Sequence, residues 1–316
     1  MLDIHDLKVA FADFTVLKGI SISLAAGEKL AVIGESGAGK TTLAMAIMGL
    51  IEGGRCSGQI IFGGQDILSS TAAEMRGIRG SKLAMVPQDV GSALHPLFPV
   101  DRQVAEAILV HNRGAEALAK EKVKELFPRV GLSGAKTTAY PHQLSGGEKQ
   151  KVLISMALAN DPKVVIFDEP TSALDPITKR QTIEVLEDLL EDRTAVIISH
   201  DINCAAQLSC KTAVMYGGTV VETGPTHAIF SSPKHPYTRG LLRTYPDMQK
   251  NKDLQGIPGE QSHGARGCSF HPRCTQKIPI CTAKAPELKD VGNRCLACHR
   301  GGIIPALKIK DLRQII

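Results

Sequence analysis

The pattern of apolar and polar positions predicts strands at both ends of the first 230 residues and helices between them. Alternation marks strands with one buried face, and short contiguous apolar runs mark strands that are buried on both faces. We expect strands at 2–11, 20–24, 29–33, 83–86, 163–167, 194–198, 212–215 and 219–222. We expect helices at 40–50, 104–110, 115–130 and 177–190. The predicted fold class is α/β, with a helical insert between about 100 and 160.

Composition limits the function classes. Of 316 residues, 43% are hydrophobic and 22% charged, which suits a large core and excludes global disorder. Aromatic residues make up 4% and Trp is absent, which argues against an aromatic platform for single-stranded nucleic acid. No apolar run reaches membrane-spanning length, and the strand-like N-terminus lacks signal-peptide features. We therefore expect a cytosolic protein.

Charge and cysteine content both change near residue 230. Residues 1–230 contain 22 Lys and Arg against 26 Asp and Glu, whereas residues 231–316 contain 15 against 6. The later segment is rich in proline and poor in long periodic stretches. We therefore expect it to need a cross-link, such as a bound metal, to hold its fold. We predict a domain boundary here and call 231–316 the cysteine-rich extension. Its basic charge suits either anionic lipid or acidic partner loops, or is simply a solvated surface.

A glycine-rich turn follows the strand expected at 29–33. Its sequence at 34–41, Gly-Glu-Ser-Gly-Ala-Gly-Lys-Thr, fits the phosphate-binding pattern G-x-x-x-x-G-K-[ST], and we call it the phosphate loop. Its backbone N–H groups and the N-terminus of the next helix suit phosphate oxygens. Lys40 is expected to reach the β- and γ-phosphates, and Thr41 to ligate Mg²⁺. The residues expected to bind ATP here are Gly34, Ser36, Gly37, Gly39, Lys40, Thr41 and Thr42.

Two adjacent carboxylates, Asp168 and Glu169, follow the buried strand expected at 163–167. Asp168 can hold Mg²⁺ through water, and Glu169 can orient or deprotonate the attacking water. A solvated Asp-Glu turn is the alternative explanation. The position of the pair downstream of a phosphate loop favours a catalytic role over a solvated turn.

The order of the motifs resembles that of the ATPase subunit of an ABC transporter. After the phosphate loop come Gln88, Leu-Ser-Gly-Gly-Glu at 144–148, Asp168-Glu169, Ser-Ala-Leu-Asp at 172–175 and Ser-His-Asp at 199–201. The resemblance covers residues 1–230. It implies a P-loop NTPase core of the RecA-like type, with an antiparallel β subdomain and a helical signature subdomain at about 89–160. The loop-rich cysteine-rich extension would follow that core.

The resemblance also implies roles for single residues. Gln88 would touch Mg²⁺ and the attacking water, His200 would lie near the γ-phosphate, and Asp175 would belong to the D-loop. Phe11 stands 23 residues before Gly34, where relatives place an aromatic residue that stacks on adenine. Phe11 can equally be a core residue at a strand end. Glu169, His200 and Gln88 are thus the expected catalytic residues.

The signature at 144–148 implies a dimer. Ser145 and Gly147 suit γ-phosphate binding at a helix N-terminus. In the family, the signature completes the ATP site of a partner cassette rather than its own. Hydrolysis would then need a second copy or a related subunit, and ATP binding would close the pair.

Three stretches resemble importers of oligopeptides, dipeptides or nickel. They are 89–98, where His95 stands in place of a common Asn, 232–242 and 267–274. The resemblance implies an importer ATPase at the cytosolic face of the membrane. Its partners would be two transmembrane permease subunits and, indirectly, an extracytoplasmic binding protein. A peptide is the expected cargo, and nickel or another metal is the alternative.

Five of the eight cysteines lie within 31 residues of the cysteine-rich extension, and in a cytosolic chain such a cluster favours metal binding over disulfides. Zinc, an iron–sulfur cluster and unligated thiols all remain open from the spacing alone. The resemblance implies a four-iron four-sulfur cluster, with Cys295 as the spare because the last ligand of the family stands before a His. The implied ligands are Cys268, Cys274, Cys281 and Cys298.

Other classes of ATPase fit less well. A ribosome-associated ABC ATPase needs a second phosphate loop, and the DNA-repair kind needs a long coiled coil where only about 105 residues separate Gly39 from Ser145. A small-molecule kinase has no use for the signature. We therefore expect no nucleic-acid partner.

Overall fold

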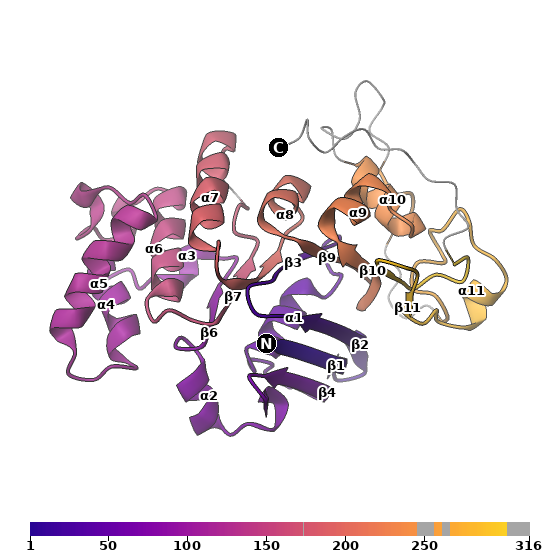
Figure 1. The fold of residues 1–316 in the computed structure, drawn as a ribbon, viewed down its shortest axis with the longest axis horizontal. Coiled ribbons are helices and arrows are strands. Elements are labelled where there is room, and N and C mark those ends of the chain that lie inside the picture. Colours follow the sequence, from indigo (N-terminus) through magenta and orange to yellow (C-terminus); the bar gives the residue numbers. More distant parts are fainter. Residues whose placement is uncertain (173, 245–255, 261–265, 302–316) are drawn as a thin grey trace. The chain divides into compact units, whose positions relative to one another are not determined.

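The structure is a computed structural model that describes residues 1–172, 174–244, 256–260 and 266–301 (Figure 1). It divides into two compact units. The first unit holds Met1–Leu24, Glu28–Leu68 and the described chain from Ser199 on, and the second holds Ala25–Gly27 and Ser69–Ile198. The domain limits expected from the sequence stay predictions.

An antiparallel sheet occupies the N-terminal part of the first unit and supplies the arrows labelled β1, β2 and β4 in Figure 1. Its strands, in spatial order, are β2 (Phe14–Leu24), β1 (Leu2–Phe11), β4 (Gly54–Phe62) and β5 (Gln65–Asp66). The alternation expected in β1 is confirmed, since Leu2 and Ile4 are buried while His5 is exposed. The first half of β4 is polar and has no such alternation, so the sequence did not predict this strand.

A second set of strands in the first unit supports the phosphate loop. β3 (Lys29–Ile33) pairs in parallel with β9 (Lys211–Tyr216), and β9 pairs with β10 (Thr219–Pro225) through the expected hairpin. The cysteine-rich extension then adds β12 (Cys295–Leu296) and β11 (Lys289–Asp290) to the edge of β10. The helices of this unit are α1 (Lys40–Ile47), α8 (Ile202–Leu208), α9 (Thr226–Ser231), α10 (Pro236–Arg243) and α11 (Ile280–Ala283).

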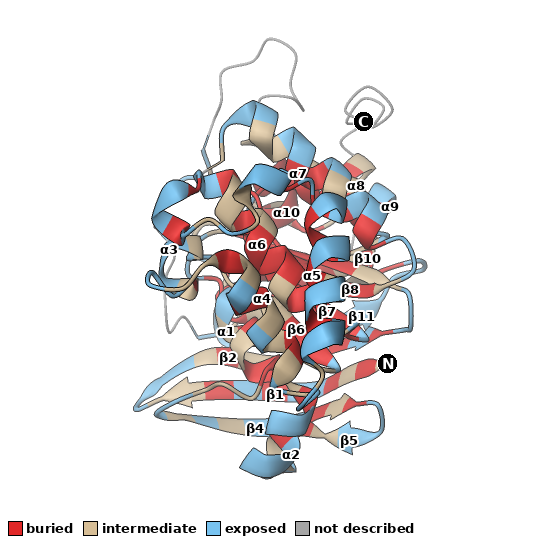
Figure 2. Ribbon diagram, turned by 90° about the vertical axis from the view of Figure 1, so that its left-hand side faces the viewer, coloured by how far each residue is buried: buried red, intermediate tan, exposed pale blue. Residues whose placement is uncertain are grey.

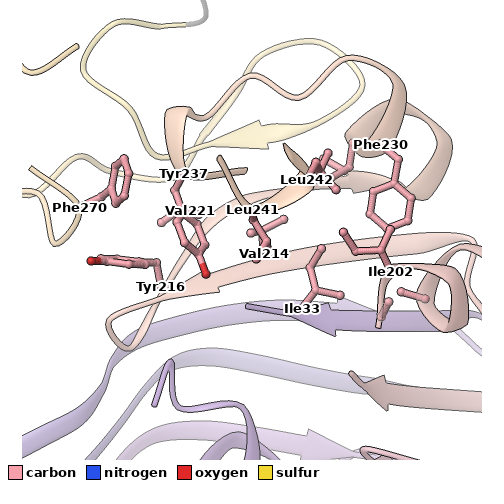
Figure 3. Packing of buried hydrophobic residues seen from close by; sticks show 13 residues of the cluster. Ile33, Ile202, Val214, Tyr216, Val221, Phe230, Tyr237, Leu241, Leu242 and Phe270 are labelled. Carbon is pink, nitrogen blue, oxygen red and sulfur yellow. The ribbon is translucent and has the colours of Figure 1, made fainter. Parts of the chain in front are cut away.

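One hydrophobic cluster spans the boundary expected near residue 230. Figure 3 shows Phe270 of the extension beside the rings of Tyr216 and Tyr237. The ring centroids of Tyr216 lie 4.6 Å from Tyr237 and 5.2 Å from Phe270. Burying an aromatic side chain in this way contributes roughly 1.5–3 kcal/mol. The extension therefore gains a core by sharing that of the strands, which its composition alone did not indicate.

A buried carboxylate also fastens the extension. Glu222 of β10 is fully buried and accepts hydrogen bonds from the backbone N–H groups of Lys234 and His235, both at 2.9 Å. The Arg294 guanidinium lies 3.2 Å from the same carboxylate. Burial lowers the pKa of His235 to about 3, so its ring stays neutral and accepts a hydrogen bond from the Tyr237 N–H.

The second unit is built on three parallel strands, β8 (Thr194–Ile198), β7 (Val164–Asp168) and β6 (Leu83–Val86), in that spatial order. Every residue of β7 and β8 is buried, which Figure 2 shows in red. The contiguous apolar runs that predict these strands are thus explained by cover on both faces.

Helices make up the rest of the second unit and confirm the expected helical insert. They are α2 (Ala72–Ile78), α3 (Val90–Ala93), α4 (Val100–Leu109), α5 (Glu116–Arg129), α6 (Gly146–Leu158) and α7 (Pro176–Leu189). In α5, the buried residues Ala119, Val123 and Leu126 follow the 3.6-residue period. Within the described chain, no helix has the length and apolar character needed to cross a membrane.

Candidate nucleotide site

The phosphate loop leaves the buried strand β3 and ends as α1 begins. Gly39 caps α1 with φ 96°, a left-handed conformation that favours glycine, and a Cβ atom there would lie 2.8 Å from Leu17 Cδ2. The Gly39 carbonyl accepts the first helical hydrogen bond from the Leu43 N–H at 2.9 Å. The left-handed backbone angle therefore favours glycine at this position.

Lys40 brings its ammonium group back over the phosphate loop. Its side chain is buried, and Nζ donates to the carbonyl oxygens of Gly34 at 2.8 Å and Glu35 at 3.1 Å. The first turn of α1 contains no acidic residue. A buried cation and an uncompensated helix N-terminus create a positive region that suits a polyphosphate.

The remaining loop residues differ in exposure. Ser36, Gly37 and Thr41 are exposed, Thr42 is half-buried, and Gly34 is buried. Phe11 is half-buried at the end of β1, where its backbone pairs with that of Phe14. Phe14 is 46% exposed and was not singled out from the sequence, although an aromatic residue at a hairpin end is a signal for stacking.

His200 lies in the first unit between two anchored residues. The Ser199 N–H donates to the Val32 carbonyl of β3 at 3.2 Å, and the Asp201 N–H donates to Ser199 Oγ at 2.9 Å. Asp201 also caps α8 by accepting from the Asn203 N–H. The imidazole of His200 is thereby presented at the surface from a fixed backbone beside β3.

In the second unit, Asp168 ends β7 and is almost fully buried. Glu169 follows with φ 54°, a left-handed conformation that is uncommon for a side chain of this kind. Its N–H donates to the Ile198 carbonyl at 2.8 Å, and its own carbonyl accepts from Ser172 Oγ at 2.9 Å. These hydrogen bonds hold the backbone turn at Glu169 in place.

Gln88 follows β6, the parallel neighbour of β7, and is exposed. The next residue, Asp89, caps α3 by accepting from the N–H groups of Gly91 and Ser92. Hydrogen bonds from Ser92 lower the pKa of the Asp89 carboxyl. Because parallel strands end at the same edge, Gln88 and the Asp168-Glu169 pair lie at one edge of the second unit.

The signature residue Ser145 caps α6 and is exposed. Its N–H donates to Glu148 Oε2 at 2.7 Å, and Ser145 Oγ accepts from the Glu148 N–H at 3.3 Å. The Ser145 N–H also lowers the pKa of the Glu148 carboxyl. This capping box fixes the first turn of a 13-residue helix whose N-terminus suits an anion.

Gly147 lets α6 approach α7 closely. A Cβ atom on this buried glycine would overlap Cγ2 of Thr178. Thr178 is in turn fixed by Asp175, which caps α7 by accepting from the N–H groups of Ile177 and Thr178 at 3.1 Å. Hydrogen bonds from Thr178 lower the pKa of the Asp175 carboxyl. The glycine of the signature and the D-loop aspartate thus belong to one packed junction.

The cysteines of the extension form a group in the first unit. Burial, with a smaller contribution from the neighbouring thiols of Cys281, Cys274 and Cys298, raises the pKa of Cys268 to about 11. The Cys268 N–H donates to the Cys281 carbonyl at 2.8 Å. Cys295 lies in β12, where its backbone pairs with Thr223. Among the described residues, no three His, Cys, Asp or Glu side chains lie close enough to share a single metal ion.

The expected residues are therefore divided between the units. Phe11, the phosphate loop, His200 and the cysteines belong to the first unit; Gln88, the signature, Asp168, Glu169 and Asp175 belong to the second. The structure adds Arg273, whose guanidinium contacts Glu35 of the phosphate loop at 2.7 Å. No sequence pattern joins two residues so far apart, and sequence reasoning missed this contact.

Two families match the chain. The family described as "ABC transporter" matches residues 17–172, and the family described as "Oligopeptide/dipeptide transporter, C-terminal region" matches residues 221–281. The second match covers the start of the cysteine-rich extension and the first three cysteines of the proposed ligand set.

Named relatives match the chain along nearly its whole length. The dipeptide transport ATP-binding protein DppD of Escherichia coli (strain K12) is 38% identical over 314 residues, which covers 95% of this chain and 96% of the relative. A putative peptide import ATP-binding protein of Brucella abortus (strain 2308) is 36% identical over 312 residues, 94% of each chain.

A solved structure shares the fold. The dimeric structure of MJ0796, a bacterial ABC transporter cassette, has a TM-score of 0.65 and 26% identity, and the alignment covers 72% of this chain and 99% of the cassette. A post-hydrolysis state of the same cassette, bound to ADP and Pi, has a TM-score of 0.63. With the family and sequence matches, this shows that the chain belongs to the ATP-binding proteins of ABC transporters, in the oligopeptide/dipeptide subfamily, and is an ABC ATPase.

Proposed function

We propose that this chain is the ATP-hydrolysing subunit of a peptide importer. The observation that carries the proposal is the 38% identity to a dipeptide transport ATP-binding protein over 95% of the chain, cysteine-rich extension included. The ABC ATPase motifs alone do not distinguish peptide importers from other transporters. Two relatives that match nearly the whole chain are named for dipeptide transport and peptide import, which supports peptides over the nickel alternative.

In this proposal, the phosphate loop binds the triphosphate of ATP. Lys40 Nζ, which donates to two loop carbonyls, transfers its hydrogen bonds to the β- and γ-phosphates. Ser36, Gly37 and Thr42 line the phosphates, and Phe11 stacks on adenine. Thr41 and Asp168 offer a hydroxyl and a carboxylate, which are oxygen donors of the kind that Mg²⁺ prefers. When bound, the ion would neutralise charge on the phosphates.

Hydrolysis is assigned to three side chains. Glu169 accepts the proton of the attacking water, and its hydrogen-bonded left-handed backbone holds the carboxylate in place for this step. Gln88 orients the water, and His200 contacts the γ-phosphate. Each role follows from the family resemblance, and the rigid attachment of each residue to the end of a strand supports it.

The signature is assigned to a partner cassette. Ser145 and Gly147 begin α6, whose N-terminus carries the partial positive charge that a γ-phosphate needs. The similar cassette MJ0796 is dimeric in its solved structures. We infer that ATP binding closes two cassettes, with Asp175 at their junction, and that hydrolysis releases them. The partner is a second copy or a sibling chain.

The closing motion would act on two transmembrane permease subunits, with cargo supplied by an extracytoplasmic binding protein. This places the chain at the cytoplasmic face of the membrane as a peripheral subunit. Residues 89–98 follow Gln88 and are proposed to receive the permease. Leu97, which is exposed in this stretch, offers an apolar contact for the permease.

Uptake of a labelled dipeptide by cells tests the assignment. Cells that lack this chain are expected to lose uptake and to regain it with the unchanged chain, because the permease cannot move cargo without the ATPase. Nickel uptake, measured in the same cells, serves as the control. Loss of nickel uptake with normal dipeptide uptake would overturn the peptide assignment and favour the metal importer.

We also propose that Cys268, Cys274, Cys281 and Cys298 hold a four-iron four-sulfur cluster. Thiolates are the donors that such a cluster uses, and other thiols of the set contribute to the raised pKa values of Cys268 and Cys274. The four cysteines of the set match the number of thiolates that such a cluster uses. When bound, it would link the loops of the extension covalently.

Anaerobic purification tests the cluster. The unchanged chain is expected to carry about four iron atoms and to absorb near ~400 nm. Cys298→Ser should lose both signals because it removes a ligand, whereas Cys295→Ser, a matched change in β12, should keep them. One zinc per chain without iron, or equal signals in Cys298→Ser and the unchanged chain, would contradict the cluster.

A further inference from the structure

The second residue of the phosphate loop, Glu35, is bonded to the cysteine-rich extension through both its side chain and its backbone. Arg273 grips the carboxylate with two nitrogens, at 2.7 Å from Nη1 to Oε2 and 3.1 Å from Nη2 to Oε1. The Glu35 N–H donates to the hydroxyl of Tyr237 at 2.8 Å. All three residues belong to the first unit.

Arg273 is itself held by the extension. Its Nε donates to the Pro258 carbonyl at 3.0 Å, and Nη2 donates to the Ile257 carbonyl at 2.9 Å. Its backbone N–H donates to the Phe270 carbonyl at 3.1 Å, and Cys274 follows it in the chain. The guanidinium therefore has a fixed position before it meets the loop.

The pair differs from an ordinary surface ion pair. The Arg273 side chain is 6% exposed and that of Glu35 is 29% exposed, so solvent screens their charges weakly. The two parallel hydrogen bonds make a bidentate contact, the strongest form of this interaction. Removing one partner from such a pair leaves the other charge uncompensated, which is the costly change.

We propose that Arg273 and Tyr237 are positioning residues for nucleotide binding. Arg273 neutralises the one carboxylate within a loop that must accept a polyanion, and Tyr237 fixes the backbone of that residue. The cysteine-rich extension thereby sets the ATP affinity of the site. This inference rests on the proposed assignment of residues 34–41 as the phosphate loop.

The sign of the effect follows from the charges. Without Arg273, the Glu35 carboxylate is an unpaired negative charge on the loop that receives the phosphates, so nucleotide affinity falls. If Glu35 is neutralised as well, the repulsion disappears and affinity returns. Loss of the Tyr237 hydroxyl acts differently, because it frees the backbone N–H of Glu35 and leaves the side-chain pair intact; neutralising Glu35 does not compensate for it.

The experiment measures the affinity of the full-length chain for MgADP by calorimetry, because ADP binds without hydrolysis. Arg273→Gln is expected to weaken binding roughly 5- to 20-fold, within the range of site-to-site coupling in proteins. Glu35→Gln alone, and the double variant Glu35→Gln with Arg273→Gln, should stay within about 1.5-fold of the unchanged chain. Tyr237→Phe should lose about threefold, with or without Glu35→Gln.

Arg294→Gln is the matched control, because Arg294 makes a second buried ion pair of the extension, with Glu222. It should bind MgADP within about twofold of the unchanged chain. Unchanged affinity in Arg273→Gln, a double variant as weak as Arg273→Gln, or an equal loss in Arg294→Gln would overturn the inference.

Two further variants keep the test decisive. If Arg273→Gln does not fold, Arg273→Lys keeps the positive charge but cannot make the two parallel hydrogen bonds. Its affinity for MgADP should fall only about two- to threefold. Unchanged affinity in both Arg273→Lys and Tyr237→Phe would then overturn the inference. Lys40→Ala separates the two proposals: normal binding there refutes the phosphate-loop assignment, whereas lost binding there with normal binding in Arg273→Gln refutes only the role of Arg273.

Discussion

A Glu169→Gln variant is expected to bind ATP normally and to lose hydrolysis by roughly 10²- to 10⁴-fold, the range for removing a general base. The amide has the volume of the carboxylate but cannot accept the proton of water. The backbone hydrogen bonds of Glu169 to Ile198 and Ser172 do not involve the altered atoms, so the local fold should persist. Steady-state phosphate release and equilibrium ATP binding measure the two properties.

The same variant reports on the dimer. With ATP and without turnover, cassettes that close on each other should accumulate as a stable pair in sedimentation. Glu187→Gln, an equal change at an exposed position of α7, is the control and should hydrolyse ATP normally without trapping a pair. Hydrolysis at the normal rate in Glu169→Gln would refute the base, and a strictly monomeric sample with ATP would refute the closing pair.

Lys40→Ala is expected to weaken nucleotide binding by roughly 100-fold or more, because it removes the charge-assisted hydrogen bonds to two phosphates. The buried ammonium of Lys40 also neutralises the carbonyl dipoles of Gly34 and Glu35. Calorimetry with ATP measures the loss, and a thermal melt confirms that the variant is folded. Lys163→Ala, at an exposed position, should bind as the unchanged chain does. Unchanged affinity in Lys40→Ala would count against the phosphate loop.

Much of the fold follows from local pattern. The 3.6-residue period of α5 and the contiguous apolar run of β7 each record a single physical environment, so sequence predicts them well. The phosphate loop can also be predicted from the sequence, since a strand, a glycine-rich turn and a helix follow one another in one short continuous stretch. By contrast, β4 begins with a polar, glycine-containing stretch and takes its strand form from pairing with β1.

Long-range contacts explain what could not be predicted. Arg273 and Glu35 are 238 residues apart, and neither residue alone indicates a partner. Tyr237 in a proline-flanked segment gave no sign that its hydroxyl reaches the phosphate loop. The left-handed turn at Glu169 is likewise held in part by a hydrogen bond to Ile198 of the neighbouring strand β8, a contact that the sequence around Glu169 does not reveal.

The aromatic interlock of Tyr216, Tyr237 and Phe270 has a consequence for engineering. The ATPase domain of such a chain cannot be exchanged as a separate module by cutting at residue 230. A chimera that joins residues 1–230 to the C-terminal segment of another protein would replace two of the three rings. The hydrophobic packing between the two parts would then be disrupted. Successful grafts must therefore carry the rings on both sides of the cut as one matched set.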